Sequence, residues 1–285
     1  MKKFTRKAAL QQQLELVKAE GKIVGFVPTM GALHAGHLSL IKQAQHQCDV
    51  VVCSIFVNPT QFNDPKDLEI YPRPLSADIA KLEEAGCDIL FNPEVSEMYD
   101  DDESWHVDIG EIEGLLEGKF RPGHYQGVTQ VVFKLLEIVT PDLAFFGQKD
   151  YQQFLVIQHM IDLLELPEKL VMCPIAREPD GLAMSSRNIH LSAADRQHAL
   201  ILSKTLNLVK RNFNSDNIVQ LKHDAEAAIA AEPGVDLAYF EIADAKTLLP
   251  ADKDTETLVA LVAATVGKTR LIDNVLLKSG DKVED

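Results

Sequence analysis

Long apolar runs and basic residues are both scarce in this sequence of 285 residues. No apolar run approaches the roughly 20 residues that a membrane-spanning helix needs. Only 28 Lys and Arg residues stand against 43 Asp and Glu residues, which gives a formal net charge of −15. Nucleic acids and anionic membrane surfaces both require a basic protein surface, so we expect neither as a partner. A small anionic substrate remains compatible with this charge if one pocket is locally positive.

Cysteines are also scarce, and they lack the spacing of a metal site. The chain has four of them: Cys48, Cys53, Cys87 and Cys173. None belongs to a C-x-x-C pair, so buried small apolar side chains explain them better than a zinc site or a disulfide framework. The basic start at residues 2–7 is similar to the beginning of a signal peptide, but Gln11, Gln12 and Gln13 interrupt the apolar region that would have to follow. We therefore expect a cytoplasmic protein.

The order of the predicted elements indicates an α/β fold for the first part of the chain. The run at 50–57 (VVVCSIFV) is apolar throughout, which is typical of a central parallel strand buried on both faces. Strands and helices alternate on either side of it, which predicts a Rossmann-like, doubly wound parallel sheet. The predicted helices cover 5–20, 37–47, 75–85, 128–138 and 151–164, and the predicted strands cover 23–27, 50–57, 87–91, 143–146 and 170–175. The acidic residues at 94–103 predict a solvated loop rather than a metal site.

A smaller α+β domain is predicted at the C-terminal end, because the pattern changes after Asn188. Ser192 is a candidate N-cap for the first helix of this domain. The predicted helices cover 193–213 and 216–231, and the predicted strands cover 237–242, 258–266 and 269–276. We place the two domains at residues 1–177 and 178–285, and we expect the polar tail from 278 to be frayed.

The stretch from Val24 to Leu38 carries the first functional signal. A strand leads through a glycine-broken loop into a helix, and His34 and His37 flank Gly36 where that helix begins. Backbone N–H groups and the helix dipole make such a terminus a binding site for anions. A zinc hydrolase pair would have i, i+4 spacing and an adjacent Glu, which are both missing, and packing in the core is the other alternative. We interpret the pair as donors to a nucleotide's phosphates that assist the departure of pyrophosphate.

Other polar loops follow other predicted strands, at 58–63, 147–150 and 176–188. Ligands of doubly wound sheets bind outside the carboxyl ends of the strands. Most of the candidate binding and catalytic residues are therefore expected at one edge of the sheet.

Five segments in order resemble one enzyme family. Residues 34–37 (HAGH) are similar to the His-x-Gly-His signature of the nucleotidyltransferase superfamily. The whole set resembles the pantothenate synthetase (pantoate–β-alanine ligase) family, and the resemblance covers nearly the whole chain. The segments are Pro28–His37 (PTMGALHAGH), Phe56–Phe62 (FVNPTQF), Arg121–Val128 (RPGHYQGV), Phe146–Gln153 (FGQKDYQQ) and Asp180–Asn188 (DGLAMSSRN).

The resemblance implies a reaction and its participants. ATP would drive the condensation of (R)-pantoate with β-alanine to pantothenate through a pantoyl adenylate, with pyrophosphate and then AMP released. Mg²⁺ would be carried mainly by the ATP phosphates rather than by protein ligands. Asp78 is the one side chain considered for Mg²⁺, and a helix-surface position is the favoured alternative. The resemblance also implies a homodimer formed through the N-terminal domain.

The resemblance further implies roles for particular residues. Catalysis would rest on His34, His37, Lys149 and Arg187. ATP would contact Met30, Gly31, Ala32, Leu33, His34, Ala35, Gly36, His37, Gly147, Gln148, Lys149, Asp150, Ala176, Met184, Ser185, Ser186 and Arg187. Pantoate would contact Gln61 and Gln153, and β-alanine would also meet Gln61. Further candidates are Pro28, Met30 and Phe62 around the pantoate methyl groups, and Asn58, Tyr71 and His124.

Several alternatives stay open at this point. Lys149 could be a solvated surface residue, and the Ser185–Arg187 segment could be a linker between domains. A nucleotidyltransferase that keeps AMP in its product would use the same His-x-Gly-His signature. An ATP-binding regulatory module is the alternative outside enzymes. Neither of these last two accounts for the pair of glutamines or for the 121–127 segment.

Overall fold

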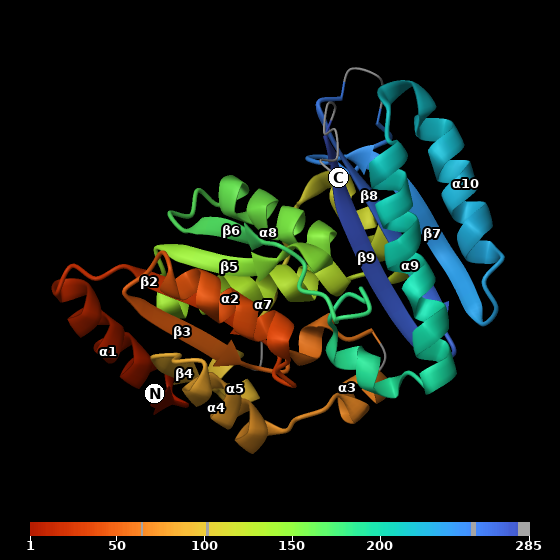
Figure 1. The fold of residues 1–285 in the computed structure, drawn as a ribbon. Coiled ribbons are helices and arrows are strands. Elements are labelled where there is room, and N and C mark those ends of the chain that lie inside the picture. Colours follow the sequence, from red (N-terminus) through yellow and green to blue (C-terminus); the bar gives the residue numbers. More distant parts are fainter. Residues whose placement is uncertain (64, 101–102, 252–254, 279–285) are drawn as a thin grey trace. The chain divides into compact units, whose positions relative to one another are not determined.

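The computed structural model describes residues 1–63, 65–100, 103–251 and 255–278 (Figure 1). The chain divides into two compact units. The first contains Met1–Gln148 and Gln152–Pro174, and the second contains Lys149–Tyr151 and the chain from Ile175 onward. The sequence placed the boundary at 177/178, so the structure's division differs for Lys149–Tyr151 and for residues 175–177, which all belong to the second unit. The tail that was expected to be frayed lies, from residue 279, outside the described residues.

The first unit is built on a sheet of six strands in the order β1-β4-β3-β2-β5-β6, and all its pairings are parallel. This confirms the predicted Rossmann-like, doubly wound sheet. Its strands are β1 (Lys2–Phe4), β2 (Val24–Thr29), β3 (Val50–Ile55), β4 (Ile89–Phe91), β5 (Leu143–Gly147) and β6 (Lys169–Cys173). The edge strand β1 was not predicted, because its three residues carry no apolar pattern. The direction of winding reverses between β2 and β5, and that reversal is where such sheets bind ligands.

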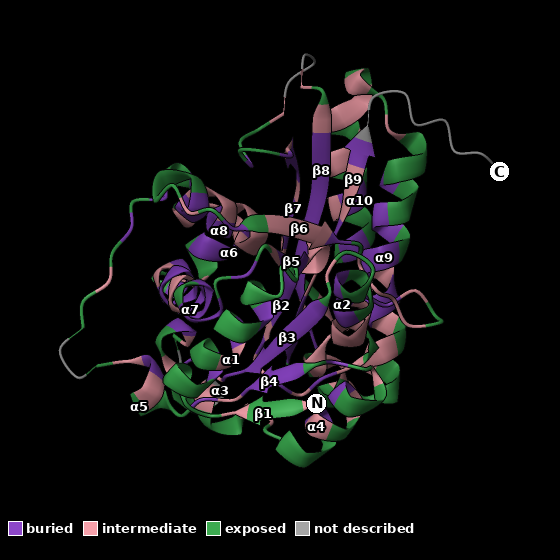
Figure 2. Cartoon of the chain, turned by 90° about the vertical axis from the view of Figure 1, so that its left-hand side faces the viewer, coloured by how far each residue is buried: buried purple, intermediate pink, exposed green. Residues whose placement is uncertain are grey.

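Helices pack around this sheet, and its central strands are buried whereas the edge strand β1 is mostly exposed (Figure 2). They are α1 (Lys7–Ala19), α2 (Ala35–Gln45), α3 (Pro65–Ile70), α4 (Leu75–Glu84), α5 (Val95–Met98), α6 (Leu116–Phe120), α7 (His124–Val139) and α8 (Tyr151–Leu163), with 3₁₀ turns η1 (Pro59–Gln61), η2 (Gly110–Gly114) and η3 (Gln148–Asp150). All six residues of β3 are buried, as its continuous apolar sequence predicted. The apolar face of α2, which includes Leu40 and Ile41, packs on β3 and β4 residues in one core cluster. Burial of this kind, at about 25 cal/mol per Å² of apolar surface, provides most of the stability of the unit.

Two of the segments predicted as loops contain α-helical residues. Helix α7 begins at His124, four residues earlier than expected, and Gly123 precedes it with a φ of 78°. A short helix α5 interrupts the acidic stretch 94–103, and its Glu97 carboxylate accepts hydrogen bonds from Arg6 at 2.8 Å and from the Lys7 N–H at 2.8 Å. These long-range partners organise residues whose local sequence is polar. Residues 101 and 102 of that stretch lie outside the described chain.

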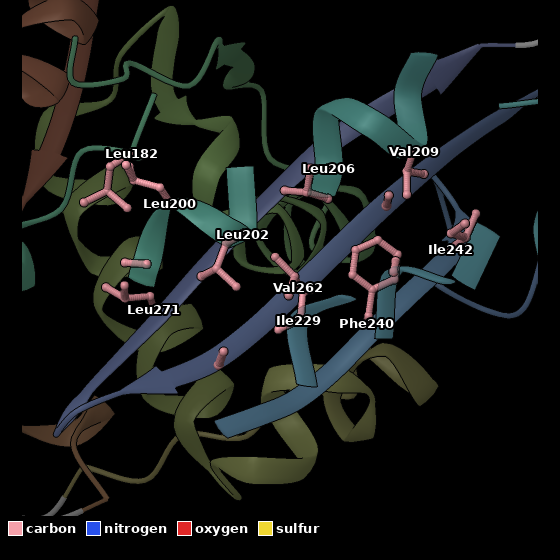
Figure 3. Close-up of a cluster of buried hydrophobic side chains, with 14 of the residues drawn as sticks. Leu182, Leu200, Leu202, Leu206, Val209, Ile229, Phe240, Ile242, Val262 and Leu271 are labelled. Carbon is pink, nitrogen blue, oxygen red and sulfur yellow. The ribbon is translucent and has the colours of Figure 1, made fainter. Parts of the chain in front are cut away.

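The second unit is an α+β fold, as predicted. Its three strands pair antiparallel in the order β7-β8-β9, with β7 at Val235–Asp244, β8 at Thr257–Val266 and β9 at Thr269–Lys278. Helices α9 (Ala193–Asn212) and α10 (Ile218–Ala230) pack on this sheet, and Figure 3 shows their shared apolar core around Leu202, Ile229 and Val262. Ser192 caps α9 as expected, because its hydroxyl accepts the Asp195 N–H at 3.1 Å. Two further 3₁₀ turns are η4 (Ser186–His190) and η5 (Ser215–Asn217).

The four cysteines are free thiols within the core or near it. Burial raises the pKa of the Cys87 thiol to about 12 and that of the Cys173 thiol to about 11. Such thiols stay protonated at neutral pH, which fits the structural role predicted for them. The described part of the chain contains no helix long and apolar enough to cross a membrane.

Candidate active site

The two histidines of the His-x-Gly-His segment form a reciprocal cap at the start of α2. His34 is the N-cap residue, and its Nδ1 accepts the Gly36 N–H at 3.1 Å. His37 lies in the first turn, and its Nδ1 accepts the His34 N–H at 3.3 Å. The two rings are stacked at a tilt, with centroids 4.1 Å apart. The cap therefore satisfies two of the N–H groups that a helix start leaves without partners.

This cap also determines the protonation state of both rings. A backbone N–H can donate only to a ring nitrogen that carries no proton, so Nδ1 is unprotonated in His34 and in His37. Each neutral ring then carries its proton on Nε2. Both side chains are consequently hydrogen-bond donors through Nε2, at a helix end whose dipole favours anions. Sequence spacing placed the rings together, but it could not assign the tautomer.

The loop before this helix is held by Asp78 of α4. Gly31 and Ala32 both have positive φ, at 82° and 49°, and the second value is unfavourable for a residue with a side chain. The Asp78 carboxylate accepts the Ala32 N–H at 2.7 Å and the Leu33 N–H at 2.8 Å. Only 1% of Asp78 is exposed, so the helix-surface interpretation was wrong. Both carboxylate oxygens serve the loop, which also leaves this side chain poorly suited to be a magnesium ligand.

Replacing Asp78 by Asn should destabilise the 31–33 loop without changing the requirement for Mg²⁺. An amide offers one acceptor oxygen where the carboxylate offers two, so one loop N–H loses its charged partner. We expect the free energy of unfolding to fall by about 1–3 kcal/mol. The Mg²⁺ concentration that gives half-maximal activity should stay unchanged. Chemical denaturation and a Mg²⁺ titration measure the two effects, and a large rise in the Mg²⁺ requirement at unchanged stability would assign Asp78 to the metal instead.

Gln61, a predicted pantoate contact, is buried at the end of η1 with 8% of its surface exposed. Its Nε2 donates to the Met30 Sδ at 3.3 Å, and its Oε1 accepts from the Asn58 Nδ2 at 3.1 Å. The structure thus brings together two residues predicted to line the same substrate, Gln61 and Met30. The amide oxygen is already held by Asn58, so the orientation of Gln61 is fixed before any ligand arrives.

Asn58 and His124, two further candidates from the resemblance, both hydrogen-bond to Gln61. Asn58 is fully buried, and its Nδ2 also donates to the Gly127 carbonyl at 3.0 Å while its Oδ1 accepts from the Tyr99 hydroxyl at 2.7 Å. Burial raises the pKa of Tyr99 to about 12, so the phenol remains a donor at neutral pH. Both polar groups of Asn58 are therefore engaged with protein atoms. Sequence reasoning missed Tyr99 altogether, since it lies 41 residues from Asn58 and in no polar motif.

The imidazole of His124 supports the backbone of the same turn. Its Nδ1 lies 2.9 Å from the Gln61 carbonyl and its Nε2 lies 3.1 Å from the Arg121 guanidinium. A guanidinium can only donate, so Nε2 accepts and the ring proton is on Nδ1, where it donates to Gln61. The 121–127 segment thus supports the backbone of η1, the turn that carries Gln61.

Three other candidates of this unit, Phe62, Tyr71 and Gln153, lie in different surroundings. Phe62 and Tyr71 pack edge to face with ring centroids 5.7 Å apart. Gln153 is half-buried on α8, and no hydrogen bond among the described residues joins it to Gln61. Its neighbour Gln152 is a structural residue, because its amide donates to the Ile112 and Leu115 carbonyls at 2.8 Å each. The two adjacent glutamines of this motif therefore have different surroundings.

In the second unit, Lys149 is largely buried and paired with its neighbour. The Nζ lies 3.2 and 3.1 Å from the two oxygens of Asp150, and 18% of the Lys149 side chain is exposed. A solvated surface lysine, the alternative left open above, does not describe this environment. Asp150 was expected to contact ATP, and in the structure its carboxylate is paired with Lys149.

Residues 176–184 form a narrow hairpin that leads into the Ser185–Arg187 segment. The Met184 N–H donates to the Ala176 carbonyl at 3.0 Å, and Arg177 bridges to Ala183 in antiparallel fashion. Ser185 caps η4 by accepting the Arg187 N–H at 3.3 Å. Arg187 itself is exposed, and no ion pair within the described chain engages it. Among the same residues, no cluster of three or more His, Cys, Asp or Glu side chains could hold a metal ion.

A doubly wound parallel sheet with a histidine-capped helix at the carboxyl end of β2 defines the class, an α/β protein built to bind the phosphates of a nucleotide. Comparison with known proteins gives the particular family. The sequence model of pantoate-β-alanine ligase matches residues 2–276. The chain belongs to the pantoate-β-alanine ligase family.

Individual relatives agree with this assignment over nearly their whole length. The chain is 48% identical over 273 residues to pantothenate synthetase of Bacteroides fragilis, covering 94% of this chain and 96% of the relative. It is 44% identical over 277 residues to pantothenate synthetase of Porphyromonas gingivalis, covering 96% and 99%.

Solved structures show the same fold. Pantothenate synthetase from Thermus thermophilus superimposes with a TM-score of 0.90 at 41% identity, covering 96% of this chain and 99% of that one. Pantoate-β-alanine ligase from Francisella tularensis, complexed with beta-gamma ATP and β-alanine, superimposes with a TM-score of 0.80 at 36% identity, covering 97% of each chain.

Proposed function

We propose that the chain uses ATP to condense (R)-pantoate with β-alanine, as a ligase that forms an amide bond. In the first step a pantoate carboxylate oxygen attacks the α-phosphorus of ATP, and pyrophosphate leaves. In the second step the β-alanine amine attacks the acyl carbon of pantoyl adenylate, and AMP leaves. The observation that carries this proposal is the reciprocal histidine cap at the end of β2, in a chain that the family model matches over residues 2–276.

The chemistry of adenylation explains the choice of residues. Attack at phosphorus needs in-line positioning and neutralisation of charge more than it needs a base. His34 and His37 would donate through Nε2 to the phosphates that leave as pyrophosphate, and both remain neutral donors because of their cap. Lys149 would leave Asp150 for the α-phosphate. Ser185, Ser186 and Arg187 would supply further donors to the triphosphate.

Pantoate would lie against Gln61, whose amide nitrogen already faces the Met30 sulfur and whose oxygen is held by Asn58. An amide suits a ligand that carries both hydroxyls and a carboxylate, because it donates and accepts. Gln61 would meet β-alanine in the second step, and Gln153 would be a second pantoate contact. Gly147 and Gln148 would border the nucleoside, with the backbone of Ala176 and Met184 near the adenine.

Three further features belong to this proposal. Mg²⁺ would enter with ATP and be held by its phosphates, since Asp78 is engaged with the loop. The protein would work in the cytoplasm. It would form a homodimer through the N-terminal domain, and a monomeric mass by light scattering at micromolar concentration would contradict the dimer.

Isotope exchange tests the reaction. Purified protein with ATP, Mg²⁺ and pantoate should exchange labelled pyrophosphate into ATP when β-alanine is absent. Addition of β-alanine should then release free AMP and pantothenate in equal amounts. Absence of pantoate-dependent exchange would refute the adenylate, and an AMP conjugate as the final product would indicate a nucleotidyltransferase instead.

A further inference from the structure

Two consecutive polar residues are buried on β9 of the second unit. Asp273 is 4% exposed and Asn274 is 2% exposed, in a strand whose other buried side chains are largely apolar. Successive residues of a strand point to opposite faces of the sheet. Buried polar groups are costly without partners, so their partners indicate why a strand carries them.

Asn274 binds the backbone of Lys149. Its Nδ2 donates to the Lys149 carbonyl at 3.0 Å, across 125 positions of sequence. The hydroxyl of Tyr151 makes a second tie, since it donates to the Ala245 carbonyl at 2.9 Å. These two bonds explain why Lys149–Tyr151 group with the second unit although the sequence around them belongs to the first.

Asp273 binds the hairpin that leads to Ser185. Its two oxygens accept from the Arg177 guanidinium at 2.7 and 2.9 Å in a two-pronged ion pair. The same guanidinium donates to the Gly181 carbonyl at 3.1 Å, so it spans the hairpin from root to tip. Asp273 also accepts the backbone N–H of Asn274 at 2.8 Å, which anchors its carboxylate to the strand.

We propose that Asp273 and Asn274 are positioning residues for adenylation. From adjacent positions on one strand, they hold the backbone of Lys149 and the root of the Ser185–Arg187 segment. The Lys149 ammonium and the donors of that segment thereby keep a fixed spacing within one unit. This inference rests on the proposed function, because it assigns both groups to the ATP phosphates.

The test is a double-mutant cycle on pantoate-dependent pyrophosphate exchange. Asn274→Ala should lower the kcat of exchange by roughly 10–100-fold, since displacement by about 1 Å can have effects of that size. In a Lys149→Ala background the same substitution should have little further effect, because the cation that Asn274 positions is gone. Asn217→Ala is the matched control, as its amide also donates to a backbone carbonyl of this unit, that of Asn212 at 2.9 Å. It should leave exchange unchanged.

The outcomes separate the inference from the function on which it rests. Additive effects of Asn274→Ala and Lys149→Ala would assign Asn274 a merely structural role and overturn the inference, with the exchange of the parent enzyme intact. Absence of exchange in the parent enzyme would instead refute the proposed function. If Asn274→Ala does not fold, Tyr151→Phe removes the other tie with little loss of packing. It should then show the same coupling to Lys149, and additivity there would equally overturn the inference.

Discussion

A His37→Asn enzyme should fold as stably as its parent and yet lose adenylation by on the order of 10²–10³-fold. The Asn Oδ1 can take the place of the ring Nδ1 and still accept the His34 N–H, which is 3.3 Å from that nitrogen in the structure. No donor then remains at the position of Nε2. Pantoate-dependent pyrophosphate exchange measures the rate, and thermal or chemical denaturation measures the stability.

The matched variant His37→Gln removes the other half of the interaction. A Gln side chain carries its amide nitrogen near the position of Nε2, but it leaves the His34 N–H without its acceptor. We expect a loss of about 1 kcal/mol in the free energy of unfolding, the typical value of an N-cap, with more of the exchange rate retained than in His37→Asn. Full activity of His37→Asn would return His37 to a purely structural role at the start of α2.

Gly127→Ala should impair the use of pantoate, because any side chain at this position would clash with the backbone of η1. A Cβ at this position would lie 2.3 Å from the Thr60 carbonyl oxygen and 2.7 Å from the Gln61 nitrogen. Both are backbone atoms of η1, so the whole turn must move and carry the Gln61 side chain with it. We expect kcat/KM for pantoate to fall by roughly 10²-fold. The free energy of unfolding should fall by about 1–3 kcal/mol from overpacking.

Gly114→Ala is the control for this substitution. Gly114 has no atom within 4 Å of the added Cβ and no positive φ, so alanine fits there without strain. Exchange assays at saturating ATP with varied pantoate should show the parent kcat/KM for Gly114→Ala. A Gly127→Ala enzyme with an unchanged pantoate dependence would show that the position of η1 does not govern this substrate.

The fold could be predicted because its signals are local. The continuous apolar run at β3 and the helical spacing around α2 each report burial within a few residues of chain. The three-residue strand β1 could not be predicted, because its pairing with β4 depends on residues about 87 positions away and not on its own composition. The start of α7 was placed too late for a similar reason. Gly127 discourages a helix by propensity, and the close approach of η1 is what requires glycine there.

The candidate site also contains some features that the sequence predicted and others that it could not predict. Spacing alone placed His34 and His37 together at a helix start, and motif resemblance singled out Gln61, Lys149 and Arg187. Sequence could not show that Asp78 holds the 31–33 loop from 45 or more residues away, and it described that residue as lying on the surface. The resemblance assigned pantoate to Gln153, but the sequence could not show that the adjacent Gln152 holds the Ile112 and Leu115 carbonyls.

The sequence by itself determined the class of fold, the position of the histidine-capped helix and the family, because strand and helix periodicity and short motifs are properties of neighbouring residues. Tertiary structure alone decided the tautomers of the two histidines, the hydrogen-bond partners of Asp78 and Asn58, and the attachment of Lys149 to β9. Each of these depends on a hydrogen bond, and a hydrogen bond requires donor and acceptor within about 3 Å. Asp78, Lys149 and, through Tyr99 and Gly127, Asn58 meet partners far apart in the chain. For the histidines, the distance depends on the backbone geometry of the cap.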